Sequence, residues 1–329
     1  MGRVEPAPRG ARGGEKTRYP TRGDVEAAFR ERGIRGLGEA VPSYLESRWT
    51  RCLFWGSVNL IVPIFPILRW GVEFDQKLET SGLLGASRSV LEGLGLRPRI
   101  LLPEGARDTL RTASLLVYGN HPSLADPFLV ALALARPDLK MLSASYLSLL
   151  LPSLGPHLIA VQPTFERKPL HLQGASHYLL VRLLYRAEGM PDPAVAREAN
   201  RRALEEAAAH AAEGGALLIA PGSRSAKGRW LPGIGVIATH LARLGREVWL
   251  APYGIRRVTN ARIYRGISKR PLARIGNALF HRRPAEITFA EPVPISTIVS
   301  DASESPSRVT ARLNEHYQTL FRTRGLDKT

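Results

Sequence analysis

The chain of 329 residues has a single cysteine, Cys52, and no Cys-x-x-Cys pair. One thiol cannot build an intramolecular disulfide framework, and the histidines lack the tight spacing and paired carboxylates of a zinc site, so we expect no metal. A Gly-x-Ser-x-Gly elbow is also missing, which excludes the serine hydrolase arrangement built on that turn. Acidic residues are few, since 29 Asp and Glu oppose 46 Lys and Arg, and the net charge is +17.

No apolar run is long and clean enough to predict a transmembrane helix. The most apolar stretch, residues 52–68, contains Asn59 and two prolines. Cations and indoles flank this stretch as they do at a lipid headgroup boundary: Arg48, Trp49, Arg51, Trp55, Arg69 and Trp70. We therefore expect a shallow or re-entrant membrane contact, with a helix pair buried against the core as the alternative. Residues 1–22 mix Gly, Pro and Arg without apolar periodicity and predict neither a packed element nor a secretory signal.

Positive charge is concentrated between residues 256 and 283, where nine Arg or Lys occur without Asp or Glu. This run predicts an anionic partner such as an acidic phospholipid surface. Few aromatic residues interleave the cations, so base stacking is disfavoured and we expect no nucleic-acid partner. A solvated basic face is the alternative that needs no partner.

The order of apolar segments predicts an α/β fold with a mixed, mostly parallel sheet covered by helices. Strands are expected near Arg97–Leu102, Ser114–Tyr118, His157–Val161, Ala216–Ala220, Val248–Tyr253 and Glu286–Ala290. Helices are expected near Leu124–Ala135, Pro193–Ala212, Gly235–Leu244 and Pro306–Phe321. We predict a disordered basic tail over residues 1–25, a helical membrane-associated segment over 26–92, and an α/β domain over 93–329.

One turn combines a histidine and an aspartate five positions apart. The segment Asn120-His121-Pro122-Ser123-Leu124-Ala125-Asp126 follows the expected strand at Ser114–Tyr118 and runs into the helix expected from Leu124, so His121 lies at the turn between them. Histidine is the side chain whose ordinary pKa lies nearest neutrality, so an exposed imidazole can take a proton from a hydroxyl. A carboxylate on one ring nitrogen would leave the other nitrogen free as the base. The residues thus predict a His121–Asp126 pair with no protein nucleophile.

The same residues permit a purely structural interpretation. Ser123-x-x-Asp126 fits a capping box, in which the serine caps a helix and the carboxylate returns a hydrogen bond. A helix cap does not require the adjacent imidazole, and capping can position the same carboxylate that orients His121. Both interpretations stay open at this stage.

A second glycine-containing turn follows the expected strand at Ala216–Ala220. Pro221 and Gly222 are followed by hydroxyl and cationic residues, namely Ser223, Arg224, Ser225, Lys227 and Arg229. Hydroxyls and cations around a glycine turn suit a cluster of anionic oxygens. A solvated basic turn is the alternative.

Together these segments resemble the glycerolipid acyltransferases of the lysophosphatidate acyltransferase type. Asn120 to Asp126 is similar to the family's Asn-His-x-Ser-x-x-Asp motif, which contains the His-x4-Asp pair, and Ala220 to Ser225 is similar to its Phe-Pro-Glu-Gly-Thr-Arg-Ser motif. Phe165-Glu166-Arg167 and Val248–Gly254 resemble two further elements. The likeness spans roughly residues 95–295. It departs at Pro221-Gly222, where the family's glutamate is absent, and after Arg167, where a helix-like insert follows.

The resemblance implies an enzyme that moves a fatty acyl group from an acyl thioester to a lysophospholipid such as 1-acylglycerol-3-phosphate. It implies His121 as base and Asp126 as its partner, with Ser223, Arg224, Ser225, Lys227, Gly222 and Arg167 at the acceptor and Asn120 and Ser123 shaping the turn. Acyl-coenzyme A or acyl carrier protein would be the donor, without a further cofactor. We expect a peripheral or shallowly anchored protein on the cytoplasmic face of a membrane. An aminolipid or glycolipid acceptor is the alternative, and a non-catalytic protein that binds anionic lipid or nucleic acid is another.

Overall fold

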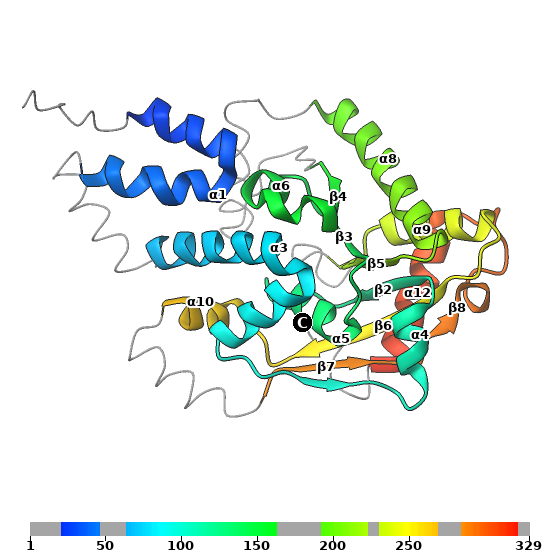
Figure 1. Cartoon of the computed structure of the whole chain (residues 1–329). Coiled ribbons are helices and arrows are strands. Elements are labelled where there is room, and N and C mark those ends of the chain that lie inside the picture. Colours follow the sequence, from blue (N-terminus) through cyan, green and yellow to red (C-terminus); the bar gives the residue numbers. More distant parts are fainter. Residues whose placement is uncertain (1–20, 47–63, 163–191, 223–229, 269–283, 322–329) are drawn as a thin grey trace, which may run out of the picture.

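The computed structural model describes residues 21–46, 64–162, 192–222, 230–268 and 284–321. These residues form an α/β fold in which helices cover both faces of one sheet (Figure 1). The strands are β1 (Arg99–Leu101), β2 (Leu115–Gly119), β3 (Leu139–Ala144), β4 (Leu158–Val161), β5 (Ala216–Ile219), β6 (Trp249–Arg256), β7 (Glu286–Phe289) and β8 (Val293–Pro294). The helices are α1 (Arg22–Glu46), α3 (Ile64–Gly93), α4 (Ala106–Thr112), α5 (Asp126–Leu134), α6 (Tyr146–Leu150), α8 (Pro193–Ala212), α9 (Gly233–Arg243), α10 (Asn260–Ser268) and α12 (Pro306–Phe321), with short 3-10 turns η1 (Pro152–His157) and η3 (Ile295–Thr297).

The sheet has the order β1-β7-β6-β2-β5-β3-β4, and β8 pairs with the start of β6. Strands β6, β2, β5, β3 and β4 run parallel to one another, whereas β7 is antiparallel to β6. The prediction of a mixed, mostly parallel sheet covered by helices is therefore confirmed. Because β6, β2 and β5 are parallel neighbours, their carboxyl ends meet at one edge of the sheet.

The central strands separate two hydrophobic cores, because successive side chains of a strand point to opposite faces. In β2, Leu115 and Val117 join one core with α3 and α5. Leu116 and Tyr118 join the other with α8, α9 and α12. Both faces of β2 are buried, as expected for a strand in the middle of a covered parallel sheet.

Connections leave β2 and β5 toward opposite faces. After β2 the chain enters α5 in the first core, and after β5 it reaches α9 in the second. In α/β sheets, the loops beyond the carboxyl ends of such neighbouring strands are where ligands bind. Both turns singled out in the sequence follow these two strands.

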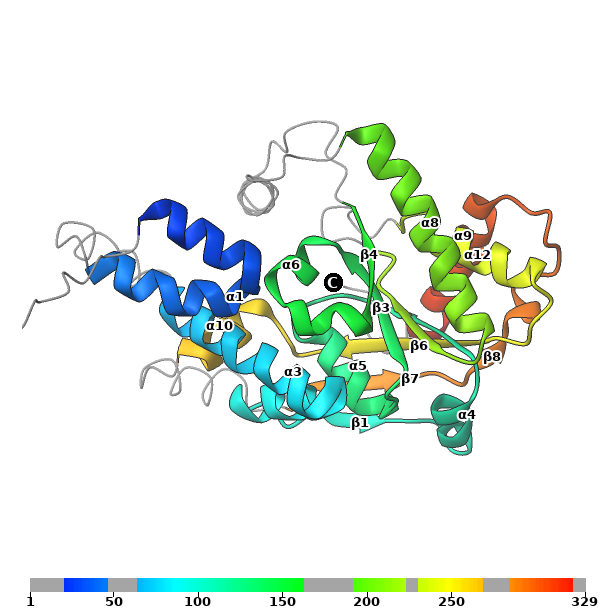
Figure 2. The same cartoon turned by 45° about the horizontal axis from the view of Figure 1, so that its top comes forward.

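The N-terminal helices α1 and α3 pack on each other and lie at the end of the molecule away from α9 and α12 (Figures 1 and 2). Each helix is interrupted by a glycine in the left-handed region, Gly33 at φ 56° and Gly82 at φ 62°. A Cβ at Gly33 would lie 2.7 Å from the Leu149 carbonyl oxygen, so close packing also requires glycine there.

A buried ion pair joins these helices to the α/β body. Asp75 of α3 is fully buried and bonds Arg35 of α1, with Asp75 Oδ2 lying 2.5 Å from Arg35 Nε. The Ser153 backbone N–H donates to Asp75 Oδ1 at 3.0 Å, and Arg35 Nη2 donates to Ser153 Oγ at 2.8 Å. The network therefore fixes α1 and α3 to η1.

The predicted membrane segment is helical in its described parts. Within residues 21–46 and 64–321, apart from the gaps given above, no helix has both the length and the apolarity of a membrane span. Residues 1–20 and 47–63 lie outside the described residues, as do Arg48, Trp49, Arg51 and Trp55. Helix α1 begins at Arg22, so residues 22–25, predicted as tail, are helical. Membrane contact and the domain boundaries stay predictions.

Candidate active site

The turn that carries His121 begins where β2 ends against β6. Gly119 pairs with Tyr253 across the two strands, and a Cβ on Gly119 would lie only 2.1 Å from the Tyr253 carbonyl oxygen. A residue larger than glycine would push β2 away from β6. Tyr253 is fully buried, and this burial, with the negative charge of Asp126, raises the pKa of its phenol. Tyr253 therefore packs as an uncharged side chain beside Gly119.

His121 and Asp126 point toward each other. The His121 Nδ1 atom lies 2.9 Å from Asp126 Oδ2, and the imidazole is 31% exposed whereas the carboxylate is 1% exposed. An ionised carboxylate only accepts, so the Nδ1 atom carries the hydrogen and Nε2 keeps its lone pair. No described residue bonds Nε2. The pair thus combines a buried, oriented acid with a partly exposed imidazole.

Ser123 holds the same carboxylate from its other side. The Ser123 backbone N–H donates to Asp126 Oδ2 at 2.9 Å, and the Ser123 hydroxyl donates to Asp126 Oδ1 at 2.6 Å. With His121 these bonds give the buried carboxylate three hydrogen bonds, which such a charge needs. The Ser123 N–H bond to Asp126 resembles the carboxylate half of a capping box, but α5 begins only at Asp126 and its N-cap residue Ala125 forms no side-chain capping bond. The carboxylate that orients His121 therefore holds the turn before α5 and does not cap the helix.

Two asparagines anchor the turn, one to the end of β6 and one to the start of α10. The Asn120 side chain forms a reciprocal pair with the Ile255 backbone, donating from Nδ2 at 2.8 Å and accepting at Oδ1 at 2.7 Å. Asn260, at the start of α10, accepts a hydrogen bond from the Leu124 N–H at 3.0 Å. Asn120 and the fully buried Ser123 thus shape the turn, and direct contact of either with a substrate stays a prediction.

The second turn leaves the neighbouring strand at the same edge. Tyr118 of β2 pairs with Ile219 of β5, two residues before Pro221. Gly222 then forms an antiparallel bridge with Trp230, and the Leu231 N–H donates to the Pro221 carbonyl at 2.9 Å. Gly222 is thus placed at the edge that carries His121. Ser223, Arg224, Ser225 and Lys227, and also Arg167, lie outside the described residues.

Comparison with known proteins adds little beyond this geometry. No protein-family model matches the sequence, and the curated proteins contain no match to it. Among solved structures, the 1-acyl-sn-glycerophosphate (LPA) acyltransferase PlsC from Thermotoga maritima is similar over 84% of this chain and 92% of its own, with 17% identity and a TM-score of 0.36. A TM-score this low does not establish a common fold. The candidate site therefore depends on its own residues.

Aromatic packing holds Trp230, which follows the second turn. The rings of Tyr118 and Trp230 lie edge to face with centroids 5.7 Å apart, and Trp230 also packs on Tyr317 of α12 at 5.4 Å. Leu231, beside Trp230, is 52% exposed, as is Leu124 in the His121 turn. Each of the two turns at this edge therefore presents an apolar side chain to its surroundings.

Three arginines lie at or beyond the end of β6, on the other flank of the His121 turn. Arg256 Nε donates to the buried Glu286 at 2.6 Å, and Arg257 lies 3.6 Å from the same carboxylate. Arg262 of α10 is also buried. Part of the basic run is thus paired with Glu286, an acid that lies just beyond the run.

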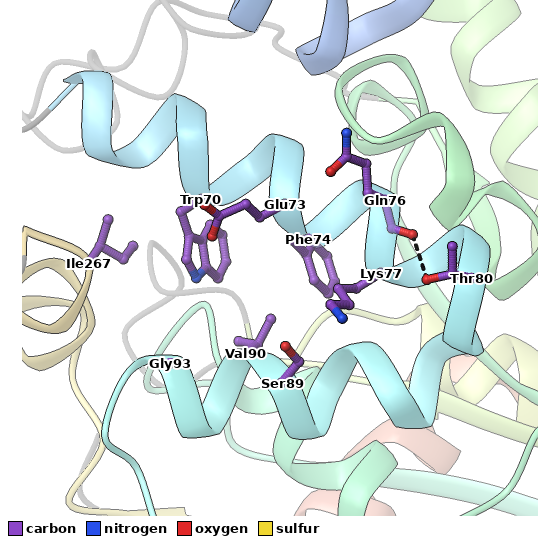
Figure 3. A pocket seen from close by; sticks show the side chains of 10 residues that line it. All are labelled: Trp70, Glu73, Phe74, Gln76, Lys77, Thr80, Ser89, Val90, Gly93 and Ile267. Carbon is purple, nitrogen blue, oxygen red and sulfur yellow. Dashed lines mark hydrogen bonds between the residues drawn. The ribbon is translucent and has the colours of Figure 1, made fainter.

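A groove of about 450 Å³ lies between the two halves of α3, on either side of the interruption at Gly82, and the end of α10 (Figure 3). Phe74, which lines it, contacts Phe128 of α5 edge to face at 4.9 Å. His121 and Asp126 are not among its lining residues. Trp70, predicted to lie at a headgroup boundary, lines this groove and stacks on Phe74 at 5.7 Å.

Sequence reasoning did not identify Asn260 or Tyr253 as supports of the site. Thr259-Asn260 carries the signal of a helix start, and Thr259 Oγ1 does accept the Arg262 N–H at 3.2 Å. The contact to Leu124 depends on the approach of two turns far apart in sequence, which no local pattern reports.

Within the described residues, no group of three or more His, Cys, Asp or Glu side chains could hold a metal ion.

Proposed function

We propose that the protein is an acyltransferase that moves a fatty acyl group from an acyl thioester to the hydroxyl of a lysophospholipid such as 1-acylglycerol-3-phosphate. The observation that carries the proposal is the 2.9 Å contact between His121 Nδ1 and the buried Asp126 carboxylate. It sits in a turn at the carboxyl edge of a mostly parallel sheet, between strands whose connections go to opposite faces.

The proposed step uses groups already oriented in the turn. His121 Nε2 takes the proton of the acceptor hydroxyl while the acceptor oxygen attacks the thioester carbonyl carbon. Asp126, which accepts the hydrogen bond from Nδ1, stabilises the imidazolium that forms when Nε2 is protonated. When the C–S bond breaks, the imidazolium returns its proton to the thiolate, and the products are the ester and the free thiol. Neither a protein nucleophile nor a metal is needed to balance this step.

The acceptor would approach from the Gly222 side. Gly222 lies at the same sheet edge, and Ser223, Arg224 and Lys227 follow it in sequence with hydroxyls and cations suited to phosphate oxygens. The absence of a glutamate between Pro221 and Gly222 favours a second candidate, an acyltransferase whose acceptor is an aminolipid or a glycolipid. Offering a panel of lysolipids to the purified protein separates the two, since transfer confined to lysophosphatidate excludes the second.

The membrane surface is the proposed source of the acceptor. The net charge of +17 favours an anionic phospholipid surface, and the acyl donor would be acyl-coenzyme A or acyl carrier protein. A peripheral position on the cytoplasmic face is consistent with both partners and forms part of the proposal.

Replacement of His121 by alanine tests the catalytic proposal. General-base action contributes about 100- to 10,000-fold, so His121→Ala should lose that factor in lysolipid-dependent thiol release from acyl-coenzyme A. His157→Ala is the matched control, because His157 lies near the amino end of β4 and its ring only approaches the Leu139 carbonyl, at 3.4 Å. Circular dichroism and thermal unfolding should show both variants folded.

The same assay distinguishes the non-catalytic alternative. A protein that only binds anionic lipid would bind vesicles in a salt-dependent way without consuming thioester. Thiol release that is absent from the wild-type protein with every lysolipid, or that persists unchanged in folded His121→Ala, would contradict the proposal.

A further inference from the structure

Arg262 is a buried cation that lacks an acidic partner among the described residues. Arg262 is only 8% exposed, and its Nη1 atom donates to the Arg257 carbonyl oxygen at 2.7 Å. Burial lowers the pKa of Arg262, and no nearby charge is among the causes. Arg136, which is 5% exposed, provides the contrast, because Arg136 Nε donates to Asp138 Oδ1 at 2.9 Å.

An unpaired buried guanidinium is costly, because arginine is rarely buried without a counter-ion. The guanidinium carries several N–H donors in a rigid fork that matches two oxygens of a phosphate. The Arg257 carbonyl occupies one donor, and the remaining donors have no partner in the described part of the chain. The charge and the donors would both be satisfied by an oxyanion.

Arg262 belongs to the element that supports the His121 turn. It lies in the first turn of α10, whose first residue Asn260 holds the Leu124 N–H. Thr259 Oγ1 accepts the Arg262 backbone N–H at 3.2 Å, so the start of this nine-residue helix is ordered at the sheet edge. The positive end of the helix dipole therefore adds to the charge of Arg262.

The backbone beside this cation is itself unusual. Arg257, whose carbonyl Arg262 binds, has φ 62° although it is not glycine. Such conformations cost of order 1 kcal/mol or more and are retained where surrounding contacts impose them. Arg256 and Arg257 both contact Glu286, whereas Arg262 bonds the Arg257 carbonyl instead, so this carboxylate is already shared by two other guanidinium groups.

We infer that Arg262, at the start of α10, binds a phosphate oxyanion of a substrate. The identity of that substrate rests on the proposed function, whereas the anion site itself does not. Two substrates carry the required group, the lysolipid acceptor in its phosphate and the coenzyme A donor in its phosphates. In either case the guanidinium of Arg262 and the positive end of the α10 dipole would bind phosphate oxygens. Arg262 would thus favour the substrate that carries the recognised phosphate.

Kinetics with truncated substrates test the inference. Arg262→Gln should raise the KM of the phosphate-bearing substrate that the site binds by about 10- to 100-fold, the value of one or two charge-assisted hydrogen bonds. Lysophosphatidate is compared with monoacylglycerol to test the acceptor, and acyl-coenzyme A with acyl-pantetheine to test the donor. The substrate that lacks the recognised phosphate should show the same KM in wild type and variant.

Arg136→Gln is the matched control for removing a buried arginine. Arg136 binds Asp138 and the carbonyls of Ala113 and Gly214, which lie two residues before β2 and β5 at the opposite edge of the sheet. Its loss should lower stability without a selective change of KM. Arg262→Lys keeps the charge but not the fork, so an intermediate KM is expected if Arg262→Gln proves too unstable to assay.

Phosphate-dependent unfolding gives a readout that does not need activity. Inorganic phosphate, compared with chloride at equal ionic strength, should raise the thermal midpoint of wild type and Arg136→Gln more than that of Arg262→Gln or Arg262→Lys. A selective phosphate effect without any acyl transfer would retain the anion site and reject the proposed function. Acyl transfer with unchanged KM values in Arg262→Gln, or equal phosphate effects in all proteins, would overturn the inference.

Discussion

At the scale of single residues, the candidate site depends on how one buried carboxylate is satisfied. Asp126 accepts from His121 Nδ1, from the Ser123 N–H and from the Ser123 hydroxyl. Each bond also restricts the direction of the carboxylate, so the imidazole is held in one tautomer and one orientation. The bonds that stabilise the turn are thus the bonds that prepare His121 as a base.

Replacing Ser123 by alanine should weaken both properties. The fully buried hydroxyl donates to Asp126 at 2.6 Å and accepts from the Ala125 N–H at 3.2 Å. Its loss leaves Asp126 under-satisfied, which costs about 1–3 kcal/mol of unfolding free energy. Lysolipid-dependent kcat should also fall, because the carboxylate is freed to rotate. Urea unfolding and steady-state kinetics measure the two effects.

Ser303→Ala is the matched control for this change. The Ser303 hydroxyl also donates to an aspartate at 2.6 Å, namely Asp301, but in an exposed loop remote in sequence from the turn. Stability and kcat close to wild type are expected there. A Ser123→Ala variant as stable and as active as Ser303→Ala would show that the hydroxyl does not position Asp126.

At this scale the sequence predicted the pair and named Ser123 and Asn120 as shaping the turn, but it did not predict the contacts that join the turn to β6 and α10. The spacing of His121, Ser123 and Asp126 within one turn is local, so the chemistry of all three could be anticipated. The contacts of Asn120 with Ile255 and of Leu124 with Asn260 join residues 135 and 136 positions apart. Such contacts depend on strand order and on where α10 begins, which local patterns do not report.

At the scale of elements, agreement follows the strength of local signals. Helix α8 begins and ends at the predicted residues, because Asp192 caps it by accepting from the Ala194 N–H at 2.8 Å and Pro193 starts it. Helix α12 also matches its prediction. Strand β3 was not predicted, since its apolar residues merge with those of α6. Strand β6 extends to Arg256, beyond the predicted end at Tyr253, because β7 pairs with its last residues.

The attachment of α1 and α3 should depend on Arg35. Arg35→Ala leaves Asp75 buried without its counter-ion, which costs about 3–5 kcal/mol in buried pairs. The partial exposure of Arg35, 26% of its side chain, places the expected loss toward the lower end of that range. Denaturant unfolding measures the change in free energy.

Arg32→Ala is the control on the same helix. Arg32 pairs with Glu39 where both side chains are largely exposed, so its removal should change stability by less than about 1 kcal/mol. Equal losses in the two variants would mean that the Arg35–Asp75 pair does not anchor the N-terminal helices.

At the scale of the whole molecule, β2 connects the candidate site to the opposite core. Tyr118 of β2 is buried, and its hydroxyl lies 3.0 Å from the Nδ1 atom of His316 in α12. His121 follows Tyr118 by three residues. Burial raises the pKa of Tyr118, so the phenol keeps its proton, and its hydroxyl forms a hydrogen bond with His316 Nδ1 whose donor is set by the imidazole tautomer. This contact joins the last helix to the central strand just before the site.

The fold should lose stability in mild acid through His316. Burial lowers the pKa of His316 below its usual value of about 6.5, so below that pH the unfolded chain binds a proton more readily than the folded one. The stabilisation is therefore complete above the unfolded pKa and is lost as the pH falls through the folded pKa. His316→Asn keeps an acceptor for Tyr118 but does not titrate, and it should lack this part of the pH dependence. Urea unfolding from pH 8 to about pH 5 measures both curves. The wild-type curve should fall more steeply below about pH 6.5 than the variant curve. Parallel curves would show that the burial of His316 does not make the fold sensitive to acid.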